Sequence, residues 1–226
     1  MSAYETKAWL QQYAEWTPAT LDYGDLTLVD MYNENLSQHA AWPATWFFGR
    51  TQTYKDLDAQ VRAAAAGLKA FGIRPGDRVA IALPNCPQHI AAFYAILKLG
   101  ATVVEHNPLY TAHELEELFQ DHKARVAIVW DNASEVFEEL RETTSLETIV
   151  SVNMTEAMPR AQQLLLRIPL PPITEKRNQL TSPAPNTVPW STLIGSAIGG
   201  DGSNLRDDGS LSPERLAVIL YTSGTP

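Results

Sequence analysis

The chain has 226 residues, a formal net charge of −9 and a pI near 5.0. Hydrophobic residues make up 45% of it and charged residues 19%, which is enough apolar material for a core and excludes global disorder. The acidic balance disfavours nucleic acid as a partner, because a phosphate backbone is bound by Lys and Arg clustered on one face. Cys86 is the single cysteine, so an internal disulfide and a thiolate metal cluster are excluded and we expect a reducing compartment.

The amino-terminal segment shows no targeting signal. Residues 1–25 are mixed and acidic, without the basic stretch and apolar run of a secretory signal. No window approaches the roughly 18 uninterrupted apolar residues of a membrane-spanning helix. We therefore expect a soluble, cytoplasmic protein with at most surface contact with a membrane. Residues 1–50 are rich in aromatic side chains without a clear period, and we interpret them as an irregular arm packed on the domain.

The pattern of residues 51–152 predicts an α/β subdomain. Apolar residues recur at helical spacing after Thr53, which can cap the helix, and Gly72 can end it in a left-handed conformation. Thr111 and Glu114 form a capping box for a later helix. Short apolar runs between the predicted helices indicate strands buried on both faces, at 79–83, 102–105, 126–130 and 148–152. Strands that alternate with helices favour a mostly parallel sheet with flanking helices.

The composition changes after Val152. Residues 153–210 contain a cluster of prolines and then a Gly-, Ser- and Asp-rich run, so we interpret them as an insertion or linker with one short amphipathic helix through Leu164. Residues 211–226 follow. Within them, the run from Leu216 to Tyr221 predicts another strand, which we expect to be exposed on one side and open to partner contact.

A turn rich in hydroxyl groups follows this last strand. Hydroxyls and free backbone amides at a strand end can donate several hydrogen bonds to phosphate oxygens. The candidate residues for binding a nucleotide's phosphates are Tyr221, Thr222, Ser223, Gly224 and Thr225. Their spacing is not that of a Walker loop, which needs Gly-x4-Gly-Lys-Ser/Thr. Clusters of Ser, Thr and Gly after strands are also common in plain turns, so the spacing alone leaves both interpretations open.

Three further groups of polar residues have simpler explanations. The histidines His106, His113 and His122 lack the spacing of a His-Glu-x-x-His motif, so we expect solvated or hydrogen-bonded side chains and predict no metal site. Four acidic residues indicate the wet face of an amphipathic helix without a catalytic role: Glu114, Glu116, Glu117 and Asp121. Four basic residues flank apolar ones and suggest peripheral contact with anionic lipid headgroups: Arg160, Arg167, Lys176 and Arg177.

Several motifs resemble the adenylate-forming superfamily. Leu216–Thr225 reads LAVILYTSGT and resembles the strand and first half of that family's phosphate loop, YTSGTTGxPKG. Asn107–Thr111, NPLYT, is similar to the form found in long-chain fatty acyl-CoA synthetases. Earlier landmarks of the family follow in the expected order: TYKDL at 53–57, GIRPGDRVAI at 72–81, LPNCP at 83–87 and AILKLGA at 95–101. The match is close over about 53–152 and 211–225 and loose between them.

This resemblance implies a partial N-terminal domain of the acyl-CoA synthetase fold. In the complete enzyme it implies a fatty acid and a nucleotide as substrates, and ATP, Mg²⁺ and coenzyme A as the reactants and cofactors of a two-step ligase. Tyr221 to Thr225 would contact the nucleotide's phosphates. The family has Thr at the position of Pro226, and its later lysine, magnesium carboxylate and carboxy-terminal domain have no counterpart here. No catalytic residue of the family therefore falls within this chain, and we expect it to be inactive without the missing carboxy-terminal part of the same protein.

Three alternatives stay open. The first is another adenylate-forming ligase, acting on short-chain, aromatic or amino acids, and the second is a noncatalytic binding fragment with the same fold. The third, a dinucleotide-binding oxidoreductase, is disfavoured because the turns after the strands lack Gly-x-Gly-x-x-Gly.

Overall fold

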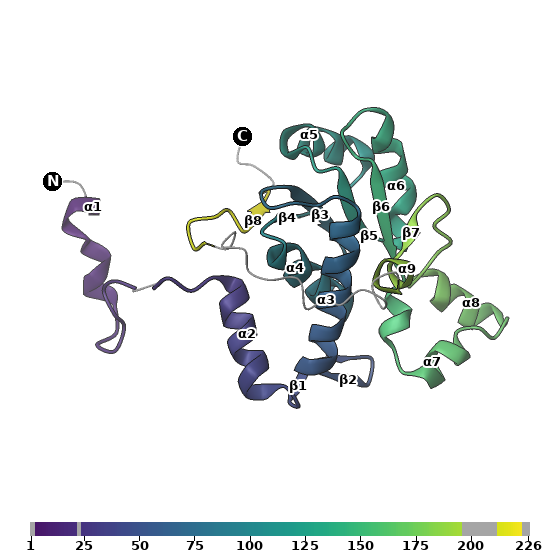
Figure 1. The fold of residues 1–226 in the computed structure, drawn as a ribbon, viewed down its shortest axis with the longest axis horizontal. Helices are drawn as coiled ribbons and strands as arrows, with labels where there is room; N and C mark the ends of the chain where they lie inside the picture. The colour runs from purple at the N-terminus through teal and green to yellow at the C-terminus, as the bar shows by residue number, and fades with distance from the viewer. Residues whose placement is uncertain (1–2, 22–23, 196–211, 223–226) are drawn as a thin grey trace.

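A six-stranded parallel sheet forms the centre of the computed structural model, which describes residues 3–21, 24–195 and 212–222. The strand order is β7-β6-β5-β3-β4-β8, and every neighbouring pair is parallel (Figure 1). The predicted α/β class with a mostly parallel sheet is thereby confirmed. The strands are β3 (Arg78–Ala82), β4 (Thr102–Glu105), β5 (Val126–Trp130), β6 (Thr148–Val152), β7 (Val188–Pro189) and β8 (Val218–Leu220).

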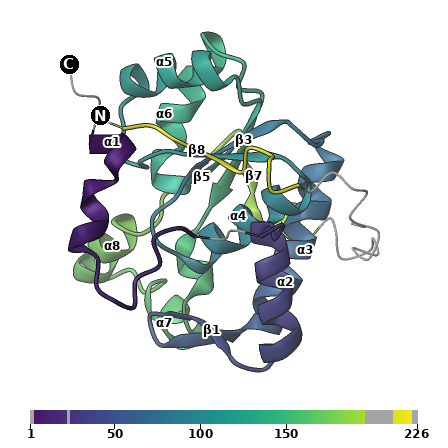
Figure 2. The same ribbon diagram turned by 90° about the vertical axis from the view of Figure 1, so that its left-hand side faces the viewer.

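Helices cover both faces of the sheet. Along β3, Val79 and Ile81 face one apolar cluster whereas Ala80 and Ala82 face the other, and all four are fully buried. Because both faces are covered, the strands are apolar throughout instead of alternating. Figure 2 shows α5 and α6 above the sheet and α3 and α4 below it. The helices of these two layers are α3 (Tyr54–Ala70), α4 (Pro87–Lys98), α5 (Ala112–His122), α6 (Ser134–Glu139) and α9 (Trp190–Gly195).

The predicted helix signals form as expected. The Thr53 hydroxyl accepts the backbone N–H of Asp56 at 3.2 Å, and the Asp56 carboxylate accepts the backbone N–H of Thr53 at 3.0 Å. Thr111 and Glu114 form the same reciprocal pair at the start of α5. After α3, Gly72 has φ +82°, the left-handed conformation that ends a helix readily at glycine.

The first fifty residues contain more regular structure than expected. The helix α2 packs Val29 and Tyr32 into the core, each 4% exposed. In contrast, residues 4–21 are almost entirely exposed, and Figure 1 shows α1 apart from the sheet, so this stretch differs from the packed arm that we predicted. The elements here are α1 (Ala3–Thr6), the 3-10 helix η1 (Ala8–Gln12), α2 (Leu28–His39) and the hairpin β1 (Pro43–Phe47) and β2 (Arg50–Thr53).

The proline-rich segment also contributes to the fold. Pro171 is the first residue of α8, where the N–H that proline lacks would have no partner within the helix. Pro189 lies on the edge strand β7, which pairs with β6, and α9 packs on α3. The expected insertion must therefore be corrected for residues 188–195, whereas its Gly-rich part, 196–210, lies outside the described residues. The remaining elements are η2 (Asp131–Ala133), η3 (Leu140–Glu142), η4 (Met154–Ala157), α7 (Arg160–Leu165) and α8 (Pro171–Asn178). Within the described ranges, no helix is long and apolar enough to cross a membrane.

Candidate functional site

Three neighbouring strands, β3, β4 and β8, end at one edge of the sheet. Because they are parallel and adjacent, the residues that follow them begin loops at the same edge. Ligands of open parallel sheets bind outside the carboxyl ends of the strands. Leu83, His106 and Tyr221 are the first residues of the three loops, which makes this edge the candidate functional site.

The last strand is shorter than predicted and is attached to β4 alone. Within the predicted run from Leu216 to Tyr221, the ladder covers three residues, Val218–Leu220. Its entry is held by Ala217, whose carbonyl accepts the Val103 N–H at 2.9 Å, and by the Thr102 hydroxyl, which donates to the Leu216 carbonyl at 2.9 Å. Leu220 is 70% exposed, as expected for a strand at the edge of the described sheet.

The structure describes two of the five predicted phosphate-binding residues. Tyr221 is half-buried and follows β8 directly, and Thr222 is exposed. Ser223, Gly224 and Thr225 lie outside the described residues. Tyr221 and Thr222 therefore lie at the carboxyl edge of the sheet, next to the end of β4.

The side chain of Tyr221 is held by α5. Its hydroxyl donates a hydrogen bond to Asp121 Oδ2 at 2.5 Å. Its ring stacks with His106, with centroids 5.9 Å apart and planes at 12°. Burial, followed by the hydrogen bond to Asp121, raises the pKa of Tyr221 to about 12, so the hydroxyl stays a donor. Asp121, which we had interpreted as part of a wet helix face, thus has a specific partner.

A buried histidine pair lies beneath this tyrosine. The Nε2 atoms of His106 and His122 are 3.0 Å apart, and the two side chains come from the loop after β4 and the end of α5. Burial lowers the pKa of His106 to about 4, and burial together with the neighbouring His106 lowers the pKa of His122 to about 3. We expected solvated or hydrogen-bonded histidines. His106 and His122 are hydrogen-bonded, and His113 is exposed.

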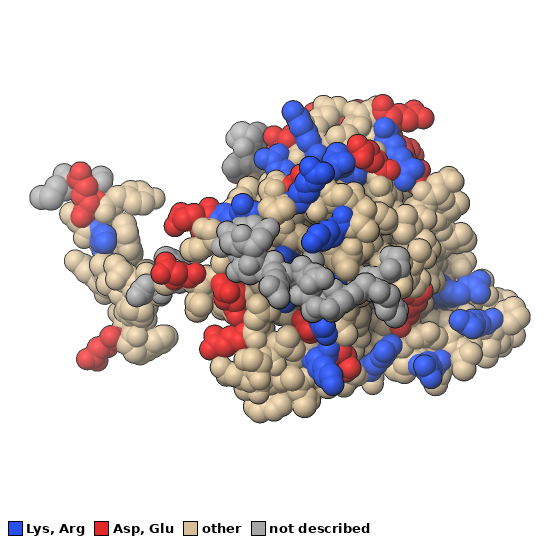
Figure 3. Space-filling view, in the orientation of Figure 1, with Lys and Arg blue, Asp and Glu red and all other residues tan. Residues whose placement is uncertain are grey.

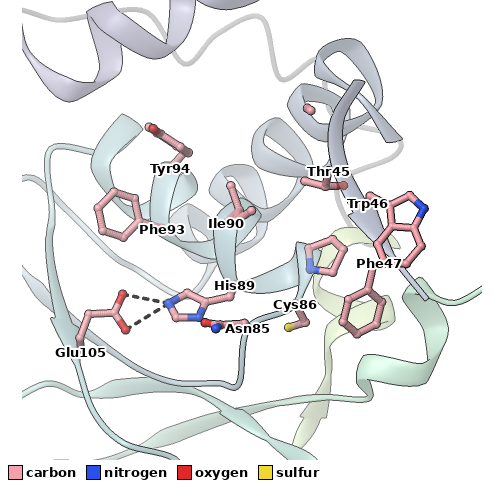
Figure 4. Close-up of a pocket in the computed structure, with 12 residues that line it drawn as sticks. Thr45, Trp46, Phe47, Asn85, Cys86, His89, Ile90, Phe93, Tyr94 and Glu105 are labelled. Carbon is pink, nitrogen blue, oxygen red and sulfur yellow. Dashed lines mark hydrogen bonds and ion pairs between the residues drawn. The ribbon is translucent and has the colours of Figure 1, made fainter. Parts of the chain in front are cut away.

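A cavity of about 630 Å³ opens beside the same edge, between the start of α4 and β1. Aromatic side chains form much of its wall, and Figure 4 shows His89 and Glu105 joined at its polar end. Burial by itself would lower the pKa of His89, but the hydrogen bond and negative charge of Glu105 outweigh it and raise the pKa. Cys86 also lines the cavity, and burial raises the pKa of its thiol to about 11, so it is not a thiolate nucleophile.

The edge offers an exposed donor for an anionic ligand. The Thr222 hydroxyl is a hydrogen-bond donor of the kind that holds phosphate oxygens. Among the described residues, no group of three or more His, Cys, Asp or Glu side chains could hold a metal ion. Of the two described residues of the motif, Thr222 has an exposed hydroxyl, whereas the Tyr221 hydroxyl is already bonded to Asp121.

Sequence patterns did not reveal the contacts around Tyr221. Asp121 precedes Tyr221 by 100 residues, and His106 lies still earlier in the chain. They contact Tyr221 only because β4 and β8 are neighbours in the sheet. The available signal was positional: His106 directly follows one predicted strand and Tyr221 is the last residue of another. That signal does not say which strands pair.

Comparison with known proteins gives the family. Residues 32–226 match the family described as AMP-binding enzyme. A long-chain-fatty-acid–CoA ligase of Bacillus subtilis (strain 168) is 29% identical over 220 residues, which are 97% of this chain and 38% of that protein.

Two solved structures share the fold. The anthranilate CoA ligase AuaEII in complex with anthranoyl-AMP has a TM-score of 0.69 at 21% identity, over 88% of this chain and 33% of that one. A long-chain-fatty-acid-CoA ligase (FadD1) from Archaeoglobus fulgidus has a TM-score of 0.65 at 21% identity, over 92% of this chain and 36% of that one. The chain thus spans well under half the length of these relatives. The match over residues 32–226 shows that the chain belongs to the AMP-binding enzyme family.

Proposed function

We propose that these residues are part of a long-chain fatty acid–CoA ligase of the AMP-forming type. In the first step a fatty acid carboxylate attacks the α-phosphate of ATP, the bond to pyrophosphate breaks, and an acyl-adenylate forms. In the second step the thiol of coenzyme A attacks the acyl carbon and AMP leaves. Membership of the AMP-binding family implies the use of ATP, while coenzyme A, Mg²⁺ and the fatty acid are part of the proposal. The name of the Bacillus subtilis relative supports the choice of acid.

The observation that carries this proposal is the place of Tyr221 and Thr222. They follow an edge strand at the carboxyl end of the parallel sheet, directly beside the end of β4. A hydrogen-bond donor at this place, such as the exposed Thr222 hydroxyl, can stabilise negative charge on the phosphates as pyrophosphate departs. A bound Mg²⁺ would neutralise the leaving pyrophosphate. The role of this chain's own residues is to orient the phosphate chain against the sheet edge.

The test uses the protein translated from the full reading frame that contains these residues. Purified protein is incubated with ATP, Mg²⁺ and a fatty acid of 16 carbons, and exchange of labelled pyrophosphate into ATP is measured, followed by acyl-CoA formation when coenzyme A is added. We expect both activities. Absence of exchange with every acid tested would refute the ligase assignment. Because the chain spans 38% of the length of its relative, we expect the 226 residues alone to give no exchange.

A second candidate is a ligase for an aromatic acid. The fold is shared with the anthranilate CoA ligase as well as with the fatty acid ligase, so this class belongs in the test. Parallel assays with anthranilate, 4-coumarate, acetate and amino acids separate the candidates. Faster pyrophosphate exchange with anthranilate than with palmitate would show that the substrate is an aromatic acid and not a fatty acid. Equilibrium dialysis of the 226-residue chain with ATP and with fatty acid tests the remaining alternative, a binding fragment without catalysis.

We also propose that α7 and α8 contact anionic lipid. Four apolar side chains here are exposed: Leu164 (62%), Leu165 (52%), Ile168 (40%) and Leu170 (53%). Residues 160–177 hold four basic side chains and one acidic one, in a chain whose net charge is −9. Figure 3 shows blue side chains gathered where Figure 1 places these helices. In the described part of the chain, no ion pair neutralises these four basic groups.

Vesicle flotation tests the lipid contact. We expect the 226-residue chain to float with vesicles that contain phosphatidylglycerol and not with pure phosphatidylcholine. Replacing the four basic residues by Gln should weaken binding, by about fivefold for each charge removed. A matched control removes four basic side chains elsewhere: Lys55, Lys69, Arg74 and Lys123. Equal loss in both variants, or no flotation of the original chain, would exclude a lipid site at α7 and α8.

A further inference from the structure

Tyr221, the first residue of the phosphate-binding motif, makes its described side-chain contacts with residues from α5 and from the loop after β4. Asp121 accepts the hydrogen bond of its hydroxyl, and the rings of His106 and His122 lie 5.9 and 6.1 Å from its own. The hydroxyl is therefore occupied within the protein and not directed at a ligand. We propose that Asp121, His106 and His122 are positioning residues, which fix Tyr221 and thereby the point at which the phosphate-binding turn leaves the sheet. The claim that this turn binds a nucleotide rests on the proposed function, whereas the anchoring of Tyr221 does not.

The hydrogen bonds around the histidines assign one arrangement of protons. The backbone N–H of Ala124 donates to His122 Nδ1 at 3.1 Å, so that nitrogen must be unprotonated. The proton of neutral His122 is then on Nε2, which donates to His106 Nε2 at 3.0 Å. His106 keeps its own proton on Nδ1, a buried atom without a hydrogen-bond partner in the described residues. Both rings are neutral in this arrangement, and each existing bond is satisfied.

An added proton has no site that preserves this arrangement. Protonation of His122 at Nδ1 would remove the acceptor of the Ala124 N–H. Protonation of His106 at Nε2 would place two N–H groups against each other at 3.0 Å. The stacking of Tyr221 on His106 depends on the position of the pair, so uptake of a proton should release Tyr221 and loosen β8.

Other charged groups near the pair act in opposite directions. The Arg78 guanidinium, which donates to the His122 carbonyl at 3.1 Å, lowers the pKa of His122, and Asp121 raises it. Burial has the largest effect and holds the pKa of both histidines below the usual 6.5. In the released state the rings are solvated and regain that ordinary value. Release is therefore favoured as the pH falls below about 6.5, by up to tenfold per pH unit for each proton taken up.

Hydrogen exchange of the 226-residue chain tests the anchoring without a ligand. The readout is the protection factor of a peptide that spans residues 216–222, corrected for the intrinsic exchange rate at each pH. Between pH 7.5 and 5.5 we expect it to fall about a hundredfold, which is about tenfold for each of the two histidines. His122→Gln keeps an N–H donor for His106 but does not titrate, so the fall should shrink to the roughly tenfold contribution of His106. The control His113→Gln, on the exposed face of the same helix, should keep the full fall.

Two variants at the hydroxyl separate anchoring from general stability. Tyr221→Phe keeps the ring and loses the bond to Asp121, and should lower protection at pH 7.5 about five- to tenfold. Asp121→Asn keeps an acceptor oxygen and should stay within about twofold of the original chain. Protection that does not change with pH, or the same fall in His122→Gln as in the original chain, would overturn the proposal even if one variant fails to fold.

Nucleotide affinity then tests whether the anchor positions the turn. For the full-reading-frame protein we expect the Kd for ATP to rise in Tyr221→Phe and to rise between pH 7.5 and 5.5, with a flatter pH profile in His122→Gln. Unchanged ATP affinity in Tyr221→Phe would overturn the positioning role. Failure to bind ATP at any pH would instead reject the proposed function, while the exchange experiment would still decide the anchoring.

Discussion

The Nε2 atom of His89, in the first turn of α4, lies 3.0 Å from Oε1 and 3.1 Å from Oε2 of Glu105, the last residue of β4. This pair joins the first turn of α4 to the end of β4, beside the candidate site. Its effect on pH dependence is opposite to that of His106 and His122, because the pKa of His89 is raised. Its contribution to stability is complete below the ordinary value near 6.5 and is lost as the pH rises through the raised pKa.

Replacing Glu105 by Gln should lower the pKa of His89, because the carboxylate that offsets the effect of burial is lost. Without the carboxylate, burial is the main influence, so the pKa of His89 should fall, which an NMR titration of its ring protons measures. The free energy of unfolding should drop by about 1–3 kcal/mol at pH 6, and by less at pH 9, where His89 is neutral in either form. Glu117→Gln, an exposed change on α5, is the control. An unaltered pKa of His89 in Glu105→Gln would show that the pair does not set it.

The capping box at the start of α3 should contribute measurably to stability. Thr53→Ala removes both the acceptor for the Asp56 N–H and the hydroxyl that donates to the Asp56 carboxylate. We expect a loss of about 1 kcal/mol in urea unfolding, whereas Thr53→Ser, which keeps the hydroxyl, should lose much less. Thr51→Ala, at an exposed position of β2, serves as the control. Equal stability of the Ala and Ser variants would mean that the cap is not formed.

Contact between α3 and α9 can be tested at Gly67. A Cβ placed there would be 2.6 Å from both Cδ1 and the backbone oxygen of Leu193. Helix propensity alone would favour Ala over Gly by about 1 kcal/mol. The clash should reverse that sign and destabilise Gly67→Ala by about 1–3 kcal/mol in thermal or urea unfolding.

A double variant supports the interpretation of the Gly67 result. Leu193→Ala removes the side-chain clash but leaves the backbone oxygen, so in a double-mutant cycle Gly67→Ala should cost less stability in the Leu193→Ala background than in the original chain, while still costing some. A stabilised Gly67→Ala variant would show that α9 does not pack on α3, and would return residues 188–195 to the linker that the sequence suggested.

The sequence predicted the interior of this fold better than its edges. Val126–Trp130 and Thr148–Val152 are strands at the predicted bounds, because a run buried on both faces is apolar at every position and ends where the apolar residues end. Capping signals at Thr53 and Thr111 act within four residues of sequence and were likewise readable. β7 was missed because it has two residues, one of them proline, and owes its place to pairing with β6.

The candidate site was predictable only in part for a related reason. The sequence predicted a strand that ends at Tyr221, with Thr222 after it; in the structure the strand ends one residue earlier, at Leu220. The anchor of Tyr221 was not visible, since Asp121 and His122 belong to a helix whose pattern of acidic residues is typical of solvent exposure. Pairing of β4 with β8 brings these segments together across about one hundred residues of chain, and no local pattern encodes that pairing.

A buried carboxylate at the carboxyl end of β5, the strand beside β3, offers a further test. Asp131, 4% exposed, follows β5 and accepts a hydrogen bond from the Thr181 hydroxyl, which attaches the segment after α8. Burial raises the pKa of Asp131 to about 6, against hydrogen bonds from Thr181 and from the backbone of Asn132 and Ser182 that lower it. As the pH rises, the Asp131 carboxyl therefore ionises in the unfolded chain before it ionises in the folded protein. The stability that protonated Asp131 contributes is complete below pH 3.8 and is lost as the pH rises to about 6.

Asp131→Asn should consequently stabilise the protein at neutral pH. The amide oxygen can still accept from Thr181, and a neutral amide is less costly to bury than a carboxylate. In urea unfolding we expect a gain of about 1–3 kcal/mol at pH 7.5 that disappears below the ordinary pKa of an aspartate, where both side chains are uncharged. Glu135→Gln, an exposed change on α6, should leave stability within about 0.5 kcal/mol at either pH. A loss of stability in Asp131→Asn at pH 7.5 would instead mean that the charge of Asp131 is needed to hold Thr181.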